Sequence, residues 1–396
     1  MKLASTYGGT MQKLDVMIIG AGLGGLVAAA GLQKAGHRVR VYEQAPELGE
    51  IGAGIMLTPN AVRALEFAGV LGEVQKWAVE PAHSYSRHYL SGEVLGQRQV
   101  TGTYEAEFGR PMLNIHRADL HRALAKCVDL HSPKTLHVGH RLQSLSQDSL
   151  SVKARFENGT VAEGEILIGA DGIRSTVRRA GLGEVSEPRF TNFVAWRGLV
   201  PLERLPEHLR STSMTSWVSP DRHVIEYAVG GLKNYVALAL QEGWTSESWS
   251  TPSSIGEVLE MFPGWHEDIT TILRATPENG SFKFALHDHD PMASWSSGRV
   301  TLLGDAAHAM LPLMAQGSAM AMEDAAILTR TLSESAEIGD ALQRYETARL
   351  TRTAWTQLKS REARQYYHSP DRGVWQNATA ERNAILYSYD VAREQI

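Results

Sequence analysis

The sequence predicts an α/β fold in which a doubly wound parallel sheet is interrupted by an antiparallel-sheet domain. Three observations indicate this fold. Residues 16–42 read as a buried strand, a glycine-rich turn, a helix and a second strand, the usual opening of a doubly wound sheet. Tryptophan, tyrosine and short alternating runs accumulate between residues 188 and 284. The parallel-sheet pattern returns at residues 299–303, a strand that runs into Gly304-Asp305.

Hydrophobic periodicity predicts the individual elements. The apolar residues 16–19 form a strand, residues 23–35 have the Ala and Leu spacing of a helix that ends at Gly36, and residues 37–42 alternate as a strand. Further strands are expected at residues 142–157, 160–168, 223–229 and 235–240, and further helices at residues 59–67, 117–128, 319–332 and 338–361.

These elements divide the chain into four segments. We expect a dinucleotide-binding part at residues 13–187, an antiparallel-sheet domain at 188–284, the resumed dinucleotide-binding part at 285–335 and a C-terminal helical region at 336–396. Aromatic residues in the tail at 366–396 raise the hypothesis of a homodimer formed through this tail or through the antiparallel-sheet domain, with packing within the chain as the equal alternative.

Charge and composition exclude several classes of partner. Lys plus Arg number 39 against 44 for Asp plus Glu, a net charge of −5 without any block of five like charges, so we expect neither a nucleic-acid nor a membrane partner. The uncharged run at residues 16–32 contains five glycines and is a poor membrane-spanning helix. A single cysteine, Cys127, excludes an intrachain disulfide and fits a cytoplasmic protein.

The turn at residues 20–25, Gly-Ala-Gly-Leu-Gly-Gly, fits the dinucleotide motif G-x-G-x-x-G. Gly20 would make the tight turn, Gly22 would let the backbone approach a pyrophosphate, and Gly25 would let the helix pack on the strand. Glu43, at the end of the second strand, suits the ribose hydroxyls. A fortuitous glycine-rich turn is disfavoured because strand, helix, second strand and acid are all in register. The motif itself does not separate FAD from NAD.

Two later sites repeat the pattern of a strand followed by a small-residue turn with a carboxylate. They are Leu-Ile-Gly-Ala-Asp-Gly at residues 167–172 and Leu-Leu-Gly-Asp at residues 302–305. Taken with the first turn, they resemble the group A flavoprotein aromatic hydroxylases, single-component FAD monooxygenases of the salicylate hydroxylase type, over residues 15–361. The resemblance implies a Rossmann-like FAD-binding domain of the para-hydroxybenzoate hydroxylase kind, bound FAD, transient NADH or NADPH, and O2 as co-substrate.

The resemblance also assigns cofactor-binding roles. It places the pyrophosphate at Gly20, Gly22 and Gly25, the adenosine ribose at Glu43, FAD contacts at Arg117 and Asp171, and the ribityl hydroxyls at Asp305. The loop at residues 312–319 resembles the one beneath the isoalloxazine, with Pro312, Gly317, Ser318 and Ala319 as candidate contacts. Because this loop opens a helix, its N–H groups could stabilise a reduced-flavin anion. A second G-x-G-x-x-G is absent, as expected where the nicotinamide binds only briefly.

His223 and Tyr227 are the candidate catalytic residues. They are four apart on a predicted strand and therefore share one face. Imidazole can accept a proton from a phenol near neutral pH, and a tyrosine hydroxyl can relay it or orient the ring. A similar pair occurs in the salicylate, hydroxybenzoate and hydroxypyridine branches of the family; the alternative is a structural histidine beside a core tyrosine. We expect no metal, because only His287 and His289 of the His-Asp-His-Asp run converge and a third ligand is not evident.

The function implied by the resemblance is NAD(P)H-consuming hydroxylation of a small phenolic or hydroxypyridine carboxylic acid by a flavin C4a-hydroperoxide. Salicylate-like decarboxylating hydroxylation is the particular prediction. Pro312 stands where the 3-hydroxybenzoate branch has glutamine, and Met56 and Leu313 stand where the 6-hydroxynicotinate branch has histidines. These differences favour salicylate, and 3-hydroxybenzoate and 6-hydroxynicotinate are kept as alternative substrates. A flavin-dependent reductase of the same fold is the alternative from another class.

Overall fold

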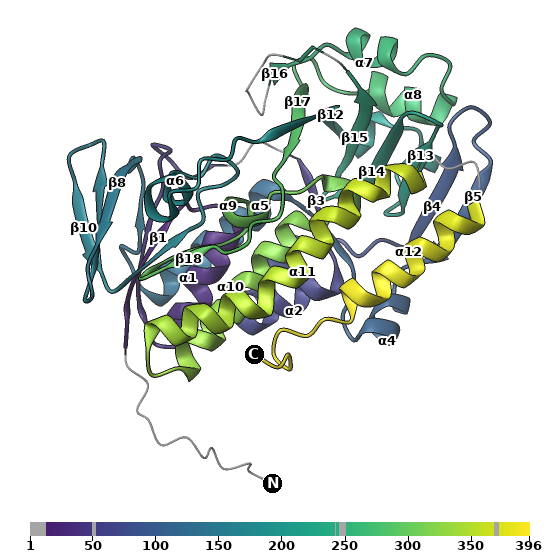
Figure 1. Cartoon of the computed structure of the whole chain (residues 1–396). Coiled ribbons are helices and arrows are strands. Elements are labelled where there is room, and N and C mark those ends of the chain that lie inside the picture. The colour runs from purple at the N-terminus through teal and green to yellow at the C-terminus, as the bar shows by residue number, and fades with distance from the viewer. Residues whose placement is uncertain (1–12, 50–52, 242, 245–250, 368–371) are drawn as a thin grey trace.

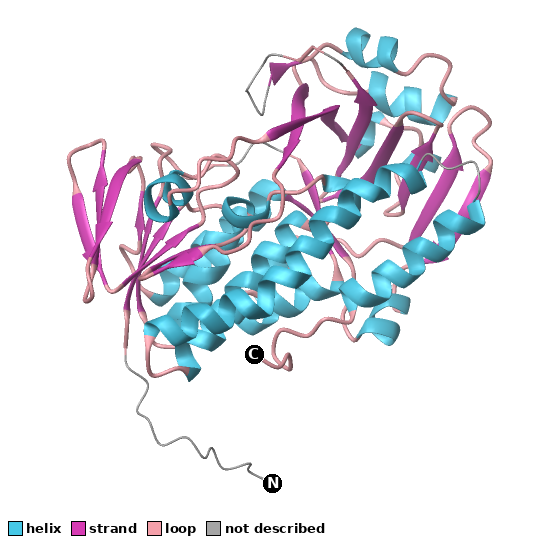
Figure 2. Cartoon of the chain, viewed as in Figure 1, coloured by secondary structure: helices cyan, strands magenta, loops and turns pink. Residues whose placement is uncertain are grey.

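The computed structural model describes residues 13–49, 53–241, 243–244, 251–367 and 372–396, with side chains left out at 364–378. The parallel sheet lies at the left of the view and a larger, mostly antiparallel sheet lies at the right (Figure 1). The long helix α11 (Ile338–Tyr367) runs diagonally from one sheet toward the other, beside α10 (Gly317–Glu334), as the colouring by secondary structure makes plain (Figure 2).

The parallel sheet has the strand order β18-β19-β11-β1-β2-β7. Its strands are β1 (Asp15–Ile19), β2 (Arg38–Tyr42), β7 (Leu136–His137), β11 (Ile166–Gly169), β18 (Ser296–Ser297) and β19 (Val300–Leu302). Strand β1 pairs in parallel with both β2 and β11, and β11 pairs in parallel with β19. The predicted first unit is therefore confirmed, and β11 and β19 are buried along their whole length, as expected for strands covered on both faces.

Helices cover this sheet and approach one another closely. The helices of this half are α1 (Leu23–Lys34), α2 (Pro59–Ala68), α3 (Leu71–Val74), α5 (Arg117–His131), α6 (Thr176–Leu182), α9 (Asp305–His308) and α10. Helix α4 (Thr103–Phe108) instead packs in the core of the larger sheet through Tyr104 and Phe108. Helices α1 and α10 pack through small residues: a Cβ added at Gly24 would lie 3.0 Å from the Ala321 Cβ, and one at Gly31 would lie 2.8 Å from the Thr329 hydroxyl. Larger side chains would push the two helices apart.

The second sheet has eight strands in the order β16-β17-β12-β15-β14-β13-β4-β5. They are β4 (His83–His88), β5 (Val94–Gln99), β12 (Arg189–Pro201), β13 (Met214–Val218), β14 (His223–Val229), β15 (Leu232–Leu240), β16 (Thr251–Pro252) and β17 (Ser281–Asp288). All neighbours are antiparallel except β13 and β4. Helices α7 (Ile255–Met261) and α8 (Glu267–Arg274) pack on one face through Val258 and Ile269.

The structure differs from the sequence prediction in three places. The inserted sheet includes β4 and β5, which come from outside residues 188–284, because the parallel pairing of β4 with β13 joins segments distant in the chain. The strand predicted at 142–157 is a hairpin of β8 (Leu142–Gln147) and β9 (Val152–Phe156). The strand predicted at 160–168 is split into β10 (Val161–Gly164), which pairs with β9, and β11 of the parallel sheet.

The end of the chain packs on the chain itself. The side chains of Tyr387, at the end of α12 (Arg372–Tyr387), and of Val391 are buried. The centre of the Tyr389 ring lies 3.8 Å from the guanidinium carbon of Arg352. This part of the tail is therefore used within the molecule, as one of the two alternatives predicted. The side chains of Tyr366, Tyr367 and Trp375 lie outside what the structure describes. Among the helices that it does describe, none is both long and apolar enough to cross a membrane.

Candidate active site

A cavity of about 340 Å³ receives residues from both sheets. On one side it is lined by the glycine turn before α1 and by the short strand β3 (Gly54–Leu57), which pairs with β6 (Leu113–His116). On the other side it is lined by β14, β15 and β17 of the eight-stranded sheet. The 3-10 turn η3 (Pro312–Met314) and the start of α10 complete the wall. Its volume is typical of small-molecule sites, and it lies outside the carboxyl ends of parallel strands, where such sheets bind ligands.

The three motif glycines have the three different environments that the motif requires. Gly20 has a φ of +107°, and a Cβ there would lie 2.4 Å from the Ala170 carbonyl oxygen. A Cβ at Gly25 would lie 2.2 Å from the Gly20 carbonyl oxygen. A Cβ at Gly22 would meet no atom within 4 Å, and this glycine lines the cavity. The turn is therefore closed toward the protein and open toward the cavity, where the N-terminus of α1 favours an anion.

Glu43 stabilises the glycine turn through hydrogen bonds on the side away from the cavity. One oxygen of its carboxylate accepts a hydrogen bond from the Ala21 N–H at 2.8 Å, and the other accepts from the Ala45 N–H at 2.9 Å. The carboxylate thus joins the end of β2 to the glycine turn, and it lies outside the lining of the cavity.

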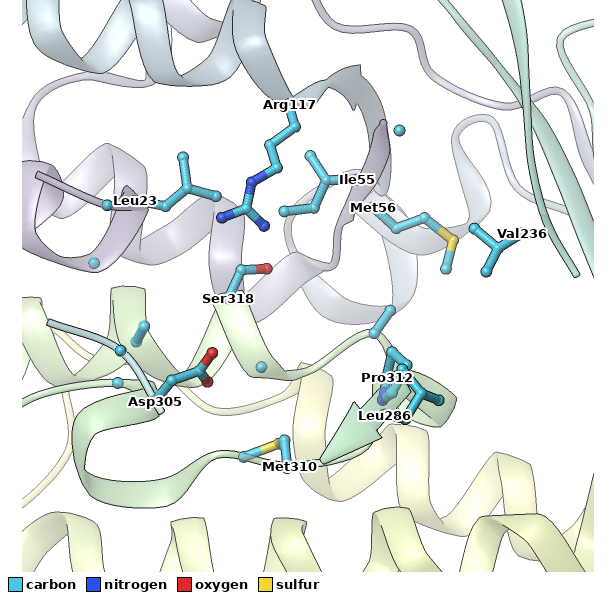
Figure 3. A pocket seen from close by; sticks show the side chains of 18 of the residues that line it. Leu23, Ile55, Met56, Arg117, Val236, Leu286, Asp305, Met310, Pro312 and Ser318 are labelled. Atoms are coloured by element: carbon cyan, nitrogen blue, oxygen red, sulfur yellow. The ribbon is translucent and has the colours of Figure 1, made fainter. Parts of the chain in front are cut away.

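Arg117, Asp305 and Ser318 face one shared space from three elements (Figure 3). Arg117 begins α5, and its own N–H donates to the Ala53 carbonyl oxygen at 2.7 Å. Asp305 begins α9 with an exposed carboxylate, and Ser318 lies in the first turn of α10. A cation, an acid and a hydroxyl therefore converge on the cavity, although the chain separates them widely.

Of the remaining candidate contacts, Pro312 and Gly317 line the cavity, whereas Ala319 is fully buried in α10 and does not. Asp171, the other predicted FAD contact, does not line the cavity. Its carboxylate accepts from the Thr176 N–H at 2.7 Å and from the Ser175 hydroxyl at 2.5 Å, so it caps the start of α6. Burial raises the pKa of Asp171, against the opposing effect of these hydrogen bonds.

His223 and Tyr227 lie on one face of β14, as predicted, and both line the cavity. Their side chains are 1 % and 4 % exposed. Burial raises the pKa of Tyr227, with the charge of Arg197 opposing it, so the phenol is held in its neutral form. The pair therefore presents an imidazole and a neutral hydroxyl to whatever occupies the cavity.

Arg197 lines the cavity from β12 and was not among the site residues predicted from the sequence. Its guanidinium carbon lies 4.5 Å from the centre of the Phe284 ring. Burial lowers its pKa to about 10, with Tyr227 opposing and Arg117 adding to the effect. Within the described ranges, no carboxylate forms an ion pair with it. The available signal was a single charge inside the otherwise apolar run at residues 193–201 of β12.

The two histidines of the His-Asp-His-Asp run lie in different environments. His287 lines the cavity, whereas His289 is buried and its Nε2 lies 2.9 Å from the Arg178 guanidinium. Asp288 pairs with Arg189 and Arg361. Over the residues whose positions are described, no three His, Cys, Asp or Glu side chains gather closely enough to hold a metal ion.

Comparison with known proteins places the chain in a family. Residues 13–358 match the family model described as FAD binding domain. The chain is 36 % identical to 6-hydroxynicotinate 3-monooxygenase of Bordetella bronchiseptica, with 97 % of each chain covered. It is 35 % identical to 3-amino-4-hydroxybenzoate 2-monooxygenase PtnB3 of Streptomyces platensis, with 95 % and 96 % covered. Among solved structures, a salicylate hydroxylase substrate complex superposes with a TM-score of 0.82 at 28 % identity, covering 97 % of each chain.

The chain therefore belongs to the FAD binding domain family of flavoproteins. Its two curated relatives above are both monooxygenases and align over nearly their whole length. The protein is an FAD-dependent monooxygenase, and the predicted group of FAD-dependent hydroxylases is confirmed.

The described residues fit this cofactor. The open side of Gly22 and the N-terminus of α1 suit a pyrophosphate, and the exposed Asp305 carboxylate suits the hydroxyls of a polyol. Gly317 and Ser318, which open α10, line the same cavity. The N-terminus of a helix stabilises negative charge, so it suits the flavin ring, which gains negative charge on reduction.

Proposed function

We propose that the enzyme hydroxylates a small aromatic ring that carries both a hydroxyl group and a carboxylate. The observation that carries this proposal is the position of Arg197, a half-buried cation in the same cavity as His223 and Tyr227. Partial withdrawal of a charge from water without a counter-ion is unfavourable, so a ligand that brings a carboxylate to Arg197 is favoured. The relatives support this choice, since 6-hydroxynicotinate, 3-amino-4-hydroxybenzoate and salicylate each combine a ring, a hydroxyl and a carboxylate.

The cofactor, reduced by NAD(P)H, supplies the activation of O2; the chain supplies orientation and proton transfer. Arg197 holds the carboxylate and thereby fixes which ring carbon faces the cofactor side of the cavity. His223 accepts the proton of the substrate hydroxyl, which makes the ring electron-rich and reactive toward an electrophilic oxygen. The Tyr227 hydroxyl orients the same oxygen. Apolar side chains such as Met56 and Leu238 line the cavity and exclude water.

On the cofactor side we assign four roles. The turn at Gly22 receives the pyrophosphate, Asp305 binds ribityl hydroxyls, and Arg117 contacts the FAD from the start of α5. Glu43, through its hydrogen bond to the Ala21 N–H, holds the turn in shape and supports the adenosine ribose. NADH or NADPH binds transiently.

Salicylate-type decarboxylating hydroxylation is the particular reaction that we predict, with 3-hydroxybenzoate and 6-hydroxynicotinate as alternatives. NADH oxidation and product identification with these three acids distinguish them. Phenol and benzoate, which each lack one of the two groups, are the matched controls and should give little hydroxylated product. Efficient hydroxylation of phenol would contradict the need for a carboxylate.

Replacing Arg197 tests the proposal directly. Arg197→Gln should raise KM for the carboxylate substrate by about 10- to 100-fold, the value of a hydrogen bond to a charged group, and should leave the affinity for the corresponding neutral amide nearly unchanged. Arg98→Gln, on the exposed edge strand β5, is the control arginine. An unchanged KM for salicylate in Arg197→Gln would show that the carboxylate binds elsewhere.

A further inference from the structure

Two adjacent acids, Glu323 and Asp324, lie buried in α10 behind the cofactor side of the cavity. Both are fully buried, and so is Arg349 of α11, which pairs with each of them at 2.8 and 2.7 Å. A buried ion pair contributes little net stability, because the desolvation of its charges offsets much of their attraction. The contacts on the other side of each acid indicate what the pair does.

Asp324 holds the turn that presents Asp305. One oxygen of its carboxylate accepts from the Gly304 N–H at 3.0 Å and contacts the His308 Nε2 at 2.6 Å; the other accepts from the Arg349 Nε at 2.7 Å. Burial would raise the pKa of Asp324, but His308 and Arg349 outweigh it and lower the pKa to about 2. Gly304 has φ +65° and ψ −140°, a backbone conformation that other residues rarely adopt. A charged anchor therefore holds a turn that requires glycine, next to a cofactor-facing carboxylate.

Glu323 contacts a different segment. Its carboxylate pairs with Arg352 at 2.8 Å and accepts a hydrogen bond of 2.7 Å from the side-chain amide of Asn60. The same amide nitrogen of Asn60 donates to the Gln316 side-chain oxygen at 2.9 Å. Glu323 is thus linked to Gln316 through one intermediate residue.

Asn60, Gln316 and Thr58 close a ring of hydrogen bonds. The Thr58 hydroxyl donates to the Asn60 oxygen at 2.8 Å, and the Gln316 amide donates to the Thr58 hydroxyl at 3.1 Å. All three side chains are at most 1 % exposed. Gln316 follows Ala315, which has a φ of +53°, and precedes Gly317 and Ser318, which line the cavity. This ring of hydrogen bonds therefore fixes the position of Gln316, and with it the backbone at the start of α10, where the first N–H groups of the helix lie.

We propose that Glu323 and Asp324 are positioning residues for two different walls of the cofactor site. Asp324 positions the turn at residues 304–305, and Glu323, through Asn60, positions the start of α10 at residues 316–318. This inference rests on the cavity as the FAD site and is independent of the substrate. If both acids only stabilised the fold, replacing either one should change FAD binding and the flavin spectrum in the same way. If they position two different walls, replacing each should give a different change.

The test compares Asp324→Asn with Glu323→Gln, with Glu334→Gln as the control because this acid of α10 forms exposed ion pairs. An amide has one acceptor oxygen, whereas each acid accepts through both of its oxygens. Each substitution therefore removes some of the hydrogen bonds and ion pairs that the acid forms. Asp324→Asn should raise the FAD dissociation constant about tenfold or more, with a parent-like flavin absorption spectrum at saturating FAD. Glu323→Gln should change that constant less than about threefold, but shift the absorption band of the bound flavin and raise the H2O2 formed per NADH.

A third variant separates the relay from the folding of the charged cluster. Asn60→Ser leaves Glu323 with both arginines and should reproduce the spectral shift and the H2O2 release of Glu323→Gln. The melting temperature of each apo-protein shows how much of any effect is lost stability. Equal loss of FAD affinity in Glu323→Gln and Asp324→Asn, in proportion to their melting temperatures, would overturn the assignment. A parent-like flavin spectrum in Asn60→Ser would overturn the relay through Gln316.

Discussion

The backbone N–H of Gly54 donates a hydrogen bond of 2.7 Å to the side-chain oxygen of Asn234. Gly54 belongs to β3 on the cofactor side of the cavity, and Asn234 belongs to β15 of the eight-stranded sheet, opposite Tyr227. A Cβ at Gly54 would lie 2.6 Å from the Tyr227 ring and 2.7 Å from the Asn234 side chain. The two halves of the molecule therefore meet at a residue that has no room for a side chain, directly beside the proposed catalytic tyrosine.

Gly54→Ala should displace the Tyr227 ring, because this ring and the Asn234 side chain both approach the position of the added Cβ. We expect a loss of about 1–3 kcal/mol in the free energy of unfolding, the usual cost of overpacking, and a larger share of NADH converted to H2O2. Denaturant titration and peroxide assays measure the two effects. Gly72→Ala is the matched control, since a Cβ there meets no atom within 4 Å. Parent-like stability and coupling in Gly54→Ala would contradict the close contact.

His223→Ala tests the proposed base. The variant should still bind FAD and accept electrons from NADH, since neither step needs the substrate proton, while hydroxylation falls by about 10²–10⁴. NADH consumption should continue with H2O2 in place of product, and raising the pH toward the pKa of the substrate phenol should partly restore coupling. Tyr227→Phe should give a milder form of the same defect. Full coupling of His223→Ala at pH 7 would identify this histidine as a structural residue.

Glu43→Ala should weaken FAD binding by about 1–3 kcal/mol, because the Ala21 and Ala45 N–H groups lose their acceptor and the glycine turn loses its brace. Fluorescence titration of the apo-protein with FAD measures the change. The exposed neighbour Glu47, replaced by alanine, is the control. Unchanged FAD affinity in Glu43→Ala would exclude this acid from the cofactor site.

The stability of the fold should decrease below neutral pH. Burial lowers the pKa of His37, His137 and His289, so the unfolded chain takes up these protons first as the pH falls. The free energy of unfolding should therefore be constant above about pH 7.5 and decrease as the pH falls below about 6.5 toward the lowered values. Urea unfolding midpoints between pH 8 and pH 5.5 measure this slope. His289→Gln should reduce it; an identical slope would show that His289 does not titrate with unfolding.

Several features followed from the sequence because they depend on residues that are near neighbours in the chain. The strand, turn and helix around residues 16–34 are confirmed, since glycine spacing and apolar periodicity are local properties. The alternation of β14 placed His223 and Tyr227 on one face for the same reason. The class of cofactor also followed, because three local turns each carry a recognisable pattern.

Other features were decided only by the tertiary structure, because they join segments that no periodicity connects. Arg197 became a cavity residue when β12 was placed so that its guanidinium reached the space beside Tyr227. Glu323 and Asp324 look from the sequence like ordinary acids in a helix, but burial against Arg349 makes them charged anchors of two separate loops. Helical spacing shows which residues share a face of α10, and only the packing of α11 and α2 against that face shows which partners they meet.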